Sequence, residues 1–192
     1  PMVNADVVLS DLAGEGITAG GLKATAMVTA LDQGAGWTVD LSADLDGISA
    51  GDPGLDDLLG DQPSLHVLLH ADQAFDQVML ESATVMTAVG RLDAMGSLGL
   101  GEGRLELTSL TGRFDLEQLS GLAGLPMTGE VILRAAARTN GWTQSVDAVI
   151  SVSGKEVLAD DPVGALLGAS PEISARLTAD GQRWNITELT LV

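Results

Sequence analysis

Apolar residues alternate with polar residues along much of this chain. The alternation is clearest in residues 22–30, 65–71, 131–138, 145–152 and 173–179. A period of two is typical of β-strands that have one apolar and one polar face, because successive side chains point to opposite sides of a strand. We therefore predict an all-β fold.

One face of these runs is uniformly aliphatic, and many of its residues are small. Its expected members are Leu22, Ala24, Ala26, Val28, Val39, Leu41, Leu65, Val67, Leu69, Val131, Leu133, Ala135, Val146, Ala148, Ile150, Ile173, Ala175 and Leu177. The many alanines leave space that a close-packed core fills with larger side chains. The pattern favours an apolar trough. The alternative that stays open is a face closed on itself, as a solid sandwich or a β-helix core.

Turn signals separate the runs at intervals of roughly ten residues, as is usual in all-β proteins. They fall at 32–34, 46–47, 99–103, 140–141 and 180–181, and the glycine-rich segment 96–103 indicates a bulged or tightly turning strand pair.

Four short segments have helical features. Residues 52–60 begin with Asp-Pro and end with Gly, which is the order expected of a helix cap, first turn and stop. Residues 161–168 repeat that pattern. The other two segments are 116–122 and their counterpart 9–12.

The chain contains an approximate copy of itself. The segment that starts at Gly21 is repeated from Gly129, and Pro63 corresponds to Pro171, in both cases 108 residues later. Self-similarity of this kind is typical of repeat architectures. We expect an elongated curled sheet or groove, with a first repeat unit at 1–112 and an incomplete second unit at 113–192, in one continuous β-rich module. Because the chain lacks an initiator Met and ends within a strand-like stretch, we expect it to be a fragment of a longer protein.

Composition and charge exclude several classes of partner. The chain is 45% apolar but only 3% aromatic, carries a net charge of −18 and has a pI of about 4.1. An anionic surface repels nucleic acids and anionic lipid headgroups, so neither is expected to bind directly. The absence of cysteine excludes disulfides and thiolate sites, and it fits both the cytosol and the periplasm.

The search for catalytic or metal-binding motifs is negative. His66 and His70 lie four residues apart, but in a strand both fall on the polar face, where solvated side chains are expected. Asp44-Leu45-Asp46-Gly47 lacks the later ligands of a calcium loop, and Gly-x-Ser-x-Gly does not occur. Trp37 and Trp142, each after a glycine, are interpreted as structural pins. We expect no enzyme activity, no cofactor and no metal.

Three phrases, LSGLAGLPMTGEV, DPVGALLGASPEISARLTADG and WNITELTLV, resemble the repeat units of the TamB proteins. These are the translocation and assembly module subunits of the AsmA-like family, and the resemblance covers nearly the whole chain. It implies a β-taco groove in the bacterial periplasm, with an inner-membrane anchor outside this chain. It further implies transport of phospholipid between the two membranes, and outer-membrane biogenesis and protein secretion with an outer-membrane barrel partner that binds elsewhere in the protein.

The sequence thus predicts a groove segment that binds phospholipid acyl chains. The alternative is a structural or protein-binding β-repeat that templates strands of outer-membrane proteins on an exposed sheet edge. A third reading, an acidic β enzyme domain, has no motif to support it. End-to-end self-association is expected wherever the ends of the sheet are exposed.

Overall fold

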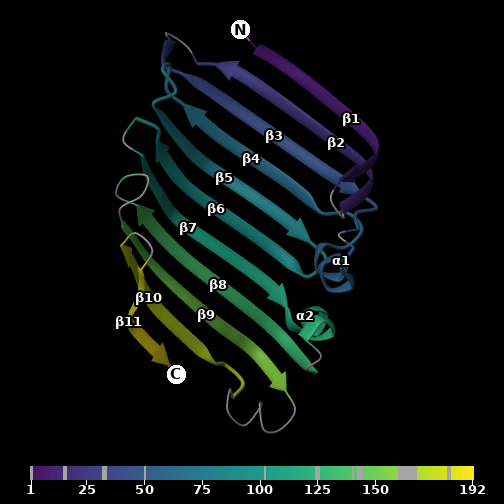
Figure 1. Ribbon diagram of the computed structural model, residues 1–192, viewed down its shortest axis with the longest axis vertical. Helices are drawn as coiled ribbons and strands as arrows, with labels where there is room; N and C mark the ends of the chain where they lie inside the picture. Colours follow the sequence, from purple (N-terminus) through teal and green to yellow (C-terminus); the bar gives the residue numbers. More distant parts are fainter. Residues whose placement is uncertain are drawn as a thin grey trace.

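The chain forms one curled, unclosed sheet of eleven antiparallel strands, together with two short helices (Figure 1). This computed structural model describes residues 2–14, 17–31, 34–49, 51–101, 103–123, 126–139, 141, 145–159, 168–180 and 183–192. The predicted all-β fold is confirmed. The antiparallel direction of the strands could not be read from the alternation.

The elements follow one another closely along the chain. The strands are β1 (Met2–Gly14), β2 (Ile17–Ala30), β3 (Trp37–Asp46), β4 (Ser64–Ala71), β5 (Gln77–Thr87), β6 (Gly90–Gly99), β7 (Arg104–Asp115), β8 (Met127–Thr139), β9 (Ser145–Ala159), β10 (Glu172–Asp180) and β11 (Arg183–Leu191), and the helices are α1 (Pro53–Leu59) and α2 (Leu116–Ala123).

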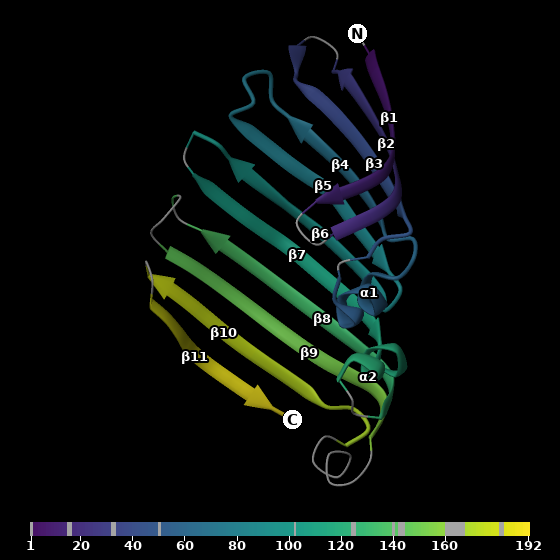
Figure 2. The ribbon, with the colours of Figure 1, turned by 45° about the vertical axis from the view of Figure 1, so that its right-hand side comes forward.

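Each strand pairs only with its neighbours in the sequence. The sheet is therefore a meander, and its two edges are β1 and β11. The two ends of the chain lie at opposite edges of the curled sheet (Figures 1 and 2). The predicted boundary between residues 112 and 113 lies within β7, and the sheet continues across it.

Shifts of register keep the apolar residues of neighbouring strands on the same face of the sheet. Six of the ten strand pairs contain one, and between β5 and β6 the paired residues step from Leu80 to Ala83. Such a β-bulge adds unpaired residues to one strand and increases its local twist. The segment 96–103 contains one of these shifts, next to Gly96, and the β6–β7 turn, so its predicted bulged or turning geometry is confirmed.

Helix α1 forms where the cap residues predict it. The Asp52 carboxylate accepts hydrogen bonds from the N–H groups of Gly54 and Leu55 at 2.9 and 3.1 Å, which satisfies donors that have no partner within the helix. Pro53 occupies the first turn, and Gly60, with φ of 72°, ends the helix. Helix α2 confirms the prediction for 116–122. The two helices lie side by side at one end of the strands (Figure 2).

The prediction of a helical segment at 9–12 is wrong, because these residues belong to β1. Leu9 pairs with Leu22 and Leu12 with Ala19, so the neighbouring strand supplies the backbone hydrogen bonds that a helix would form internally. Asp11, at φ of 52°, interrupts the regular strand between them.

Some predictions lie outside the described residues. They are the helical turn at 161–167, the tryptophan at 142, and the turn residues at 32–33, 140 and 181.

Gly36, just before β3, allows the β2–β3 connection to lie against the end of β4. Its φ is 135°, and a Cβ atom there would be 2.1 Å from the backbone oxygen of Ala71. We expect Gly36→Ala to lower the free energy of unfolding by about 2 kcal/mol or more. Urea denaturation followed by circular dichroism measures this.

Gly101→Ala is the matched control, because no atom lies within 4 Å of the added Cβ and the φ of Gly101 is not positive. Equal unfolding midpoints for the two variants would contradict the close approach seen at Gly36.

Candidate apolar binding face

All eighteen residues predicted for the aliphatic face lie on one face of the sheet, which we call the apolar face. Residues directly opposite one another in an antiparallel pair share a face. Leu41, for example, pairs with Ala26 and with Val67. The same relation continues through β5, β6 and β7 to Leu133, Ile150 and Ala175. That these residues contact a ligand stays a prediction.

Further residues of the apolar face were missed by the sequence reasoning. They are Val3, Ala5, Val7 and Leu9 on β1, Val78, Leu80, Ala83 and Val85 on β5, Leu92, Ala94 and Leu98 on β6, Leu105, Leu107, Leu110 and Phe114 on β7, and Ile186, Leu189 and Leu191 on β11. In β5, β7 and β11, two polar residues in succession, as at Thr108-Ser109, interrupt the alternation, and a search that allowed one such skip would have found these residues. The residues on β1 and β6 alternate without a skip.

The apolar face excludes charge. In the described strands, no Lys, Arg, His, Asp or Glu occupies a paired position on it. A charged side chain there would lose hydration without gaining a partner. The face is thus an uncharged and largely aliphatic surface that extends across eleven strands.

The described residues provide no second sheet to cover this face. Only seven hydrophobic residues are buried in the described chain, four of them alanines, and no side chain is fully buried. Leu41, Val67, Leu133 and Ile150 are half-buried. The described strands therefore do not close into the solid sandwich that the sequence left open.

The helix end of the strands is the most tightly packed part. Val89 in the β5–β6 turn is 3% exposed and Leu116 at the start of α2 is 7% exposed. The N–H of Ala88 donates to the backbone oxygen of Leu59, which ties α1 to this turn. Helix α2 contacts β7 and β8 as well as α1. The helices therefore pack against the strands at this end of the sheet.

The opposite face of the sheet, the polar face, carries all nine Lys and Arg residues. Eight of the nine lie on β6 to β11, and only Lys23 lies on the earlier strands. Met79 and Met95 on this face are also about half exposed. The polar face is thus the charged, solvated side of the sheet.

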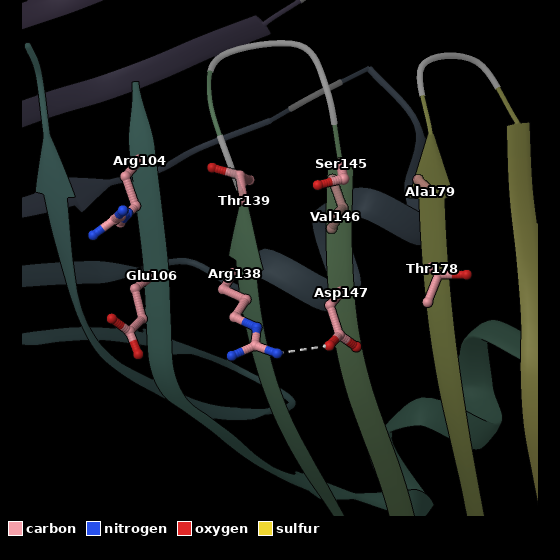
Figure 3. Close-up of a pocket in the computed structure, with 9 residues that line it drawn as sticks. All are labelled: Arg104, Glu106, Arg138, Thr139, Ser145, Val146, Asp147, Thr178 and Ala179. Atoms are coloured by element: carbon pink, nitrogen blue, oxygen red, sulfur yellow. Dashed lines mark hydrogen bonds and ion pairs between the residues drawn. The ribbon is translucent and has the colours of Figure 1, made fainter. Parts of the chain in front are cut away.

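Asp147 on β9 is held between two arginines. It lies directly opposite Arg138 on β8, whose Nη2 donates to Oδ2 at 3.2 Å (Figure 3). Arg176 on β10 donates from Nε and Nη2 at 3.2 and 3.0 Å. Hydrogen bonds from Arg176, together with its charge and the contact with Arg138, lower the pKa of Asp147 below its ordinary value. The carboxylate is therefore a fixed anion at neutral pH.

Asp93 on β6 has a similar environment. Arg91 donates to both of its carboxylate oxygens, and Thr84 Oγ1 donates at 2.7 Å. The hydrogen bond from Arg91, and then that from Thr84, lowers the pKa of Asp93. The Arg91–Asp93 pair lies within β6, and the Thr84 hydrogen bond joins β6 to β5. These contacts do not provide a group that exchanges protons near neutral pH.

His66 and His70 lie on the polar face, as predicted, and each contacts a carboxylate. His66 Nε2 lies 3.0 Å from Asp40 Oδ1, and His70 Nε2 contacts Glu81. Thr38 Oγ1 lies 2.9 Å from His70 Nδ1. Within the described residues no group of three His, Cys, Asp or Glu could hold a metal ion.

An open depression of about 530 Å³ lies where β7, β8, β9 and β10 meet the loops opposite the helices (Figure 3). Its lining residues are Arg104, Glu106, Arg138, Thr139, Ser145, Val146, Asp147, Thr178 and Ala179. Asp147 is paired with Arg138 there, and both histidines lie on β4, away from Ser145.

None of the described helices is long and apolar enough to cross a membrane. No known protein family, curated protein or solved structure matches the chain.

We expect Arg176→Gln to raise the pKa of Asp147 toward its ordinary value, because the two hydrogen bonds that favour the carboxylate are lost. A carboxyl NMR titration measures this. Since folding lowers this pKa, the stability that the pair contributes is present above the ordinary pKa and is lost as the pH falls through the folded-state pKa.

Arg134→Gln is the matched control. Arg134 lies on β8 like Arg138, but it is opposite Thr111 and Ser151 and does not bond to Asp147. If both variants shifted the titration of Asp147 equally, a general change of charge would be the cause, and the assigned contacts would be wrong.

Proposed function

We propose that this chain is a segment of a lipid-carrying protein and that its apolar face binds phospholipid acyl chains. The observation that carries the proposal is an uncharged aliphatic surface that spans eleven strands with no second sheet over it in the described residues. Each methylene group that leaves water gains about 0.8 kcal/mol. Such binding needs no polar recognition, which agrees with a face made of Leu, Val, Ile and Ala.

The curl of the sheet gives this proposal its geometry. We propose that the apolar face is the inside of the curl and forms a groove, with the charged polar face outside. The groove is then built from two copies of one unit, in which β8, β9 and β10 repeat β2, β3 and β4. Acyl chains would lie along the inside while headgroups stay in water.

From the resemblance to TamB proteins, we propose that this groove lies in the periplasm of a bacterium with two membranes. There it would carry phospholipid between the inner and outer membranes and support outer-membrane biogenesis. An inner-membrane anchor and the site for an outer-membrane barrel partner would lie elsewhere in the full protein. No cofactor and no catalytic step are part of this proposal.

Photo-crosslinking from the two faces tests the proposal. A photoreactive amino acid at Ile150, on the apolar face of β9, is expected to crosslink to phospholipid, whereas the same probe at Ser151 is not. The two positions are adjacent and both half-buried, but they lie on opposite faces. Native mass spectrometry of the purified chain should detect phospholipid bound to the unmodified protein.

Probes at Val67 and Leu133 extend the test to β4 and β8. Equal labelling from Ile150 and Ser151, or a protein free of lipid after mixing with phosphatidylcholine vesicles, would contradict the proposal.

A second candidate function, binding of protein strands, is favoured by the two sheet edges. Val8 on β1 and Ile186 on β11 are 75% and 65% exposed, and both strands pair on one side only. Unpaired backbone groups on an edge can add an extended strand from another protein. Unfolded outer-membrane barrel proteins would supply such strands.

Val8→Lys tests this candidate, because a lysine on an edge strand opposes strand addition. The unmodified chain is expected to reduce the light scattering of an outer-membrane barrel protein diluted from urea, and Val8→Lys to reduce it less. Met95→Lys is the control, because Met95 is an exposed residue of the central strand β6. If both variants reduced the light scattering equally, strand addition at the β1 edge would be contradicted.

A further inference from the structure

An aromatic pair lies at the end of the strands that is opposite the helices. The rings of Trp37 and Phe75 stack with their centroids 6.3 Å apart and their planes at 16°. Trp37 begins β3 and pairs with Ala30 and Ala71, which places it on the apolar face. Phe75 comes from the turn between β4 and β5. The pair therefore adjoins the apolar face at the end opposite the helices.

The backbone of Phe75 is unusual for an aromatic residue. Its φ is 59°, a left-handed conformation that Gly and Asn adopt far more readily than bulky residues do. The turn fixes this conformation. The N–H of Phe75 donates to the backbone oxygen of Asp72 at 3.1 Å, and that of Asp72 to the backbone oxygen of Gln77 at 3.0 Å. A turn chosen only for stability would have Gly or Asn at this position.

Phe75 is also exposed, with 48% of its surface in contact with solvent. The chain has only two Phe, three Trp and no Tyr, so an exposed aromatic ring is rare in it. The other phenylalanine, Phe114, lies on the apolar face of β7 at the helix end, opposite Gly90 and Val131. A strained, exposed aromatic residue beside a continuous apolar surface is typical of a site that contacts a ligand.

We propose that the Trp37–Phe75 pair is the point where a phospholipid acyl chain enters the apolar face. This inference rests on the proposed function and adds an entrance to it. Flat aromatic rings offer a large apolar contact area and lose little conformational entropy on binding. At the opposite end of the strands, where α1 and α2 lie, Val89 and Leu116 are buried, whereas the aromatic pair carries an exposed ring.

Fluorescence of Trp37 tests the entrance directly. The substitutions Trp142→Phe and Trp184→Phe leave Trp37 as the single tryptophan. Vesicles of phosphatidylcholine with dibrominated acyl chains are expected to quench its fluorescence, and vesicles of unbrominated phosphatidylcholine are not. Quenching by bromine requires close approach to the ring, so it reports an acyl chain at the pair.

Phe75→Asn in the same background separates binding from folding. Asn tolerates the left-handed backbone, so the melting temperature is expected to change by no more than about 3 °C, as for a small change in stability. The apparent affinity for phosphatidylcholine is expected to fall about tenfold because the aromatic contact is lost. Phe75→Tyr, which keeps the ring, is expected to retain the affinity.

The outcomes distinguish this inference from the proposed function. Phospholipid crosslinked to Ile150 without quenching of Trp37, or with unchanged affinity in Phe75→Asn, would overturn the entrance and leave the proposed function intact. Quenching of Trp37 without crosslinks at Ile150 would mean that the Trp37–Phe75 pair contacts a membrane surface. That result would also overturn the entrance. Neither quenching nor crosslinks would overturn both.

Discussion

The backbone hydrogen bonds between consecutive strands hold this fold together. The described part of the sheet has no fully buried side chain and thus little of the packed interior that stabilises most domains. The backbone ladder and the cross-strand pairs therefore provide most of its cohesion. Register is critical in such a sheet, because a slip of one residue would move an apolar strand face into water. The shifts of register between Leu80 and Ala83 and between Leu107 and Leu110 keep successive strands in phase.

The phase of the strands was predictable because alternation is a local property, and α1 was predictable from its cap at Asp52 and its stop at Gly60. Two similar six-residue segments show the limit of predicting structure from local sequence. LSDLAG continues β1, because β2 pairs with it, whereas LSGLAG forms part of α2. Whether such a segment forms a strand or a helix depends on whether another strand pairs with it. The sequence of the segment does not reveal that pairing. Alternation likewise gave the members of the apolar face but not whether a second layer covers it.

The two faces of the sheet differ sharply in charge. Because all nine Lys and Arg residues are on the polar face, the apolar face keeps one chemistry from β1 to β11. The ion pairs of Asp147 link β9 to β8 and β10, and the Arg91–Asp93 pair lies within β6. Both lie on the side where water can solvate them, so they add no desolvated charge. The polar face can therefore vary in charge along the sheet without altering the hydrocarbon surface behind it.

The meander has a consequence for the size of the molecule. Each strand pairs only with the strands before and after it, so one further hairpin would lengthen the sheet by about 10 Å without changing its cross-section. The length of such a sheet is then set by the number of its hairpins. Gene duplication of a strand pair could fit the molecule to a wider gap while every existing contact stays as it is.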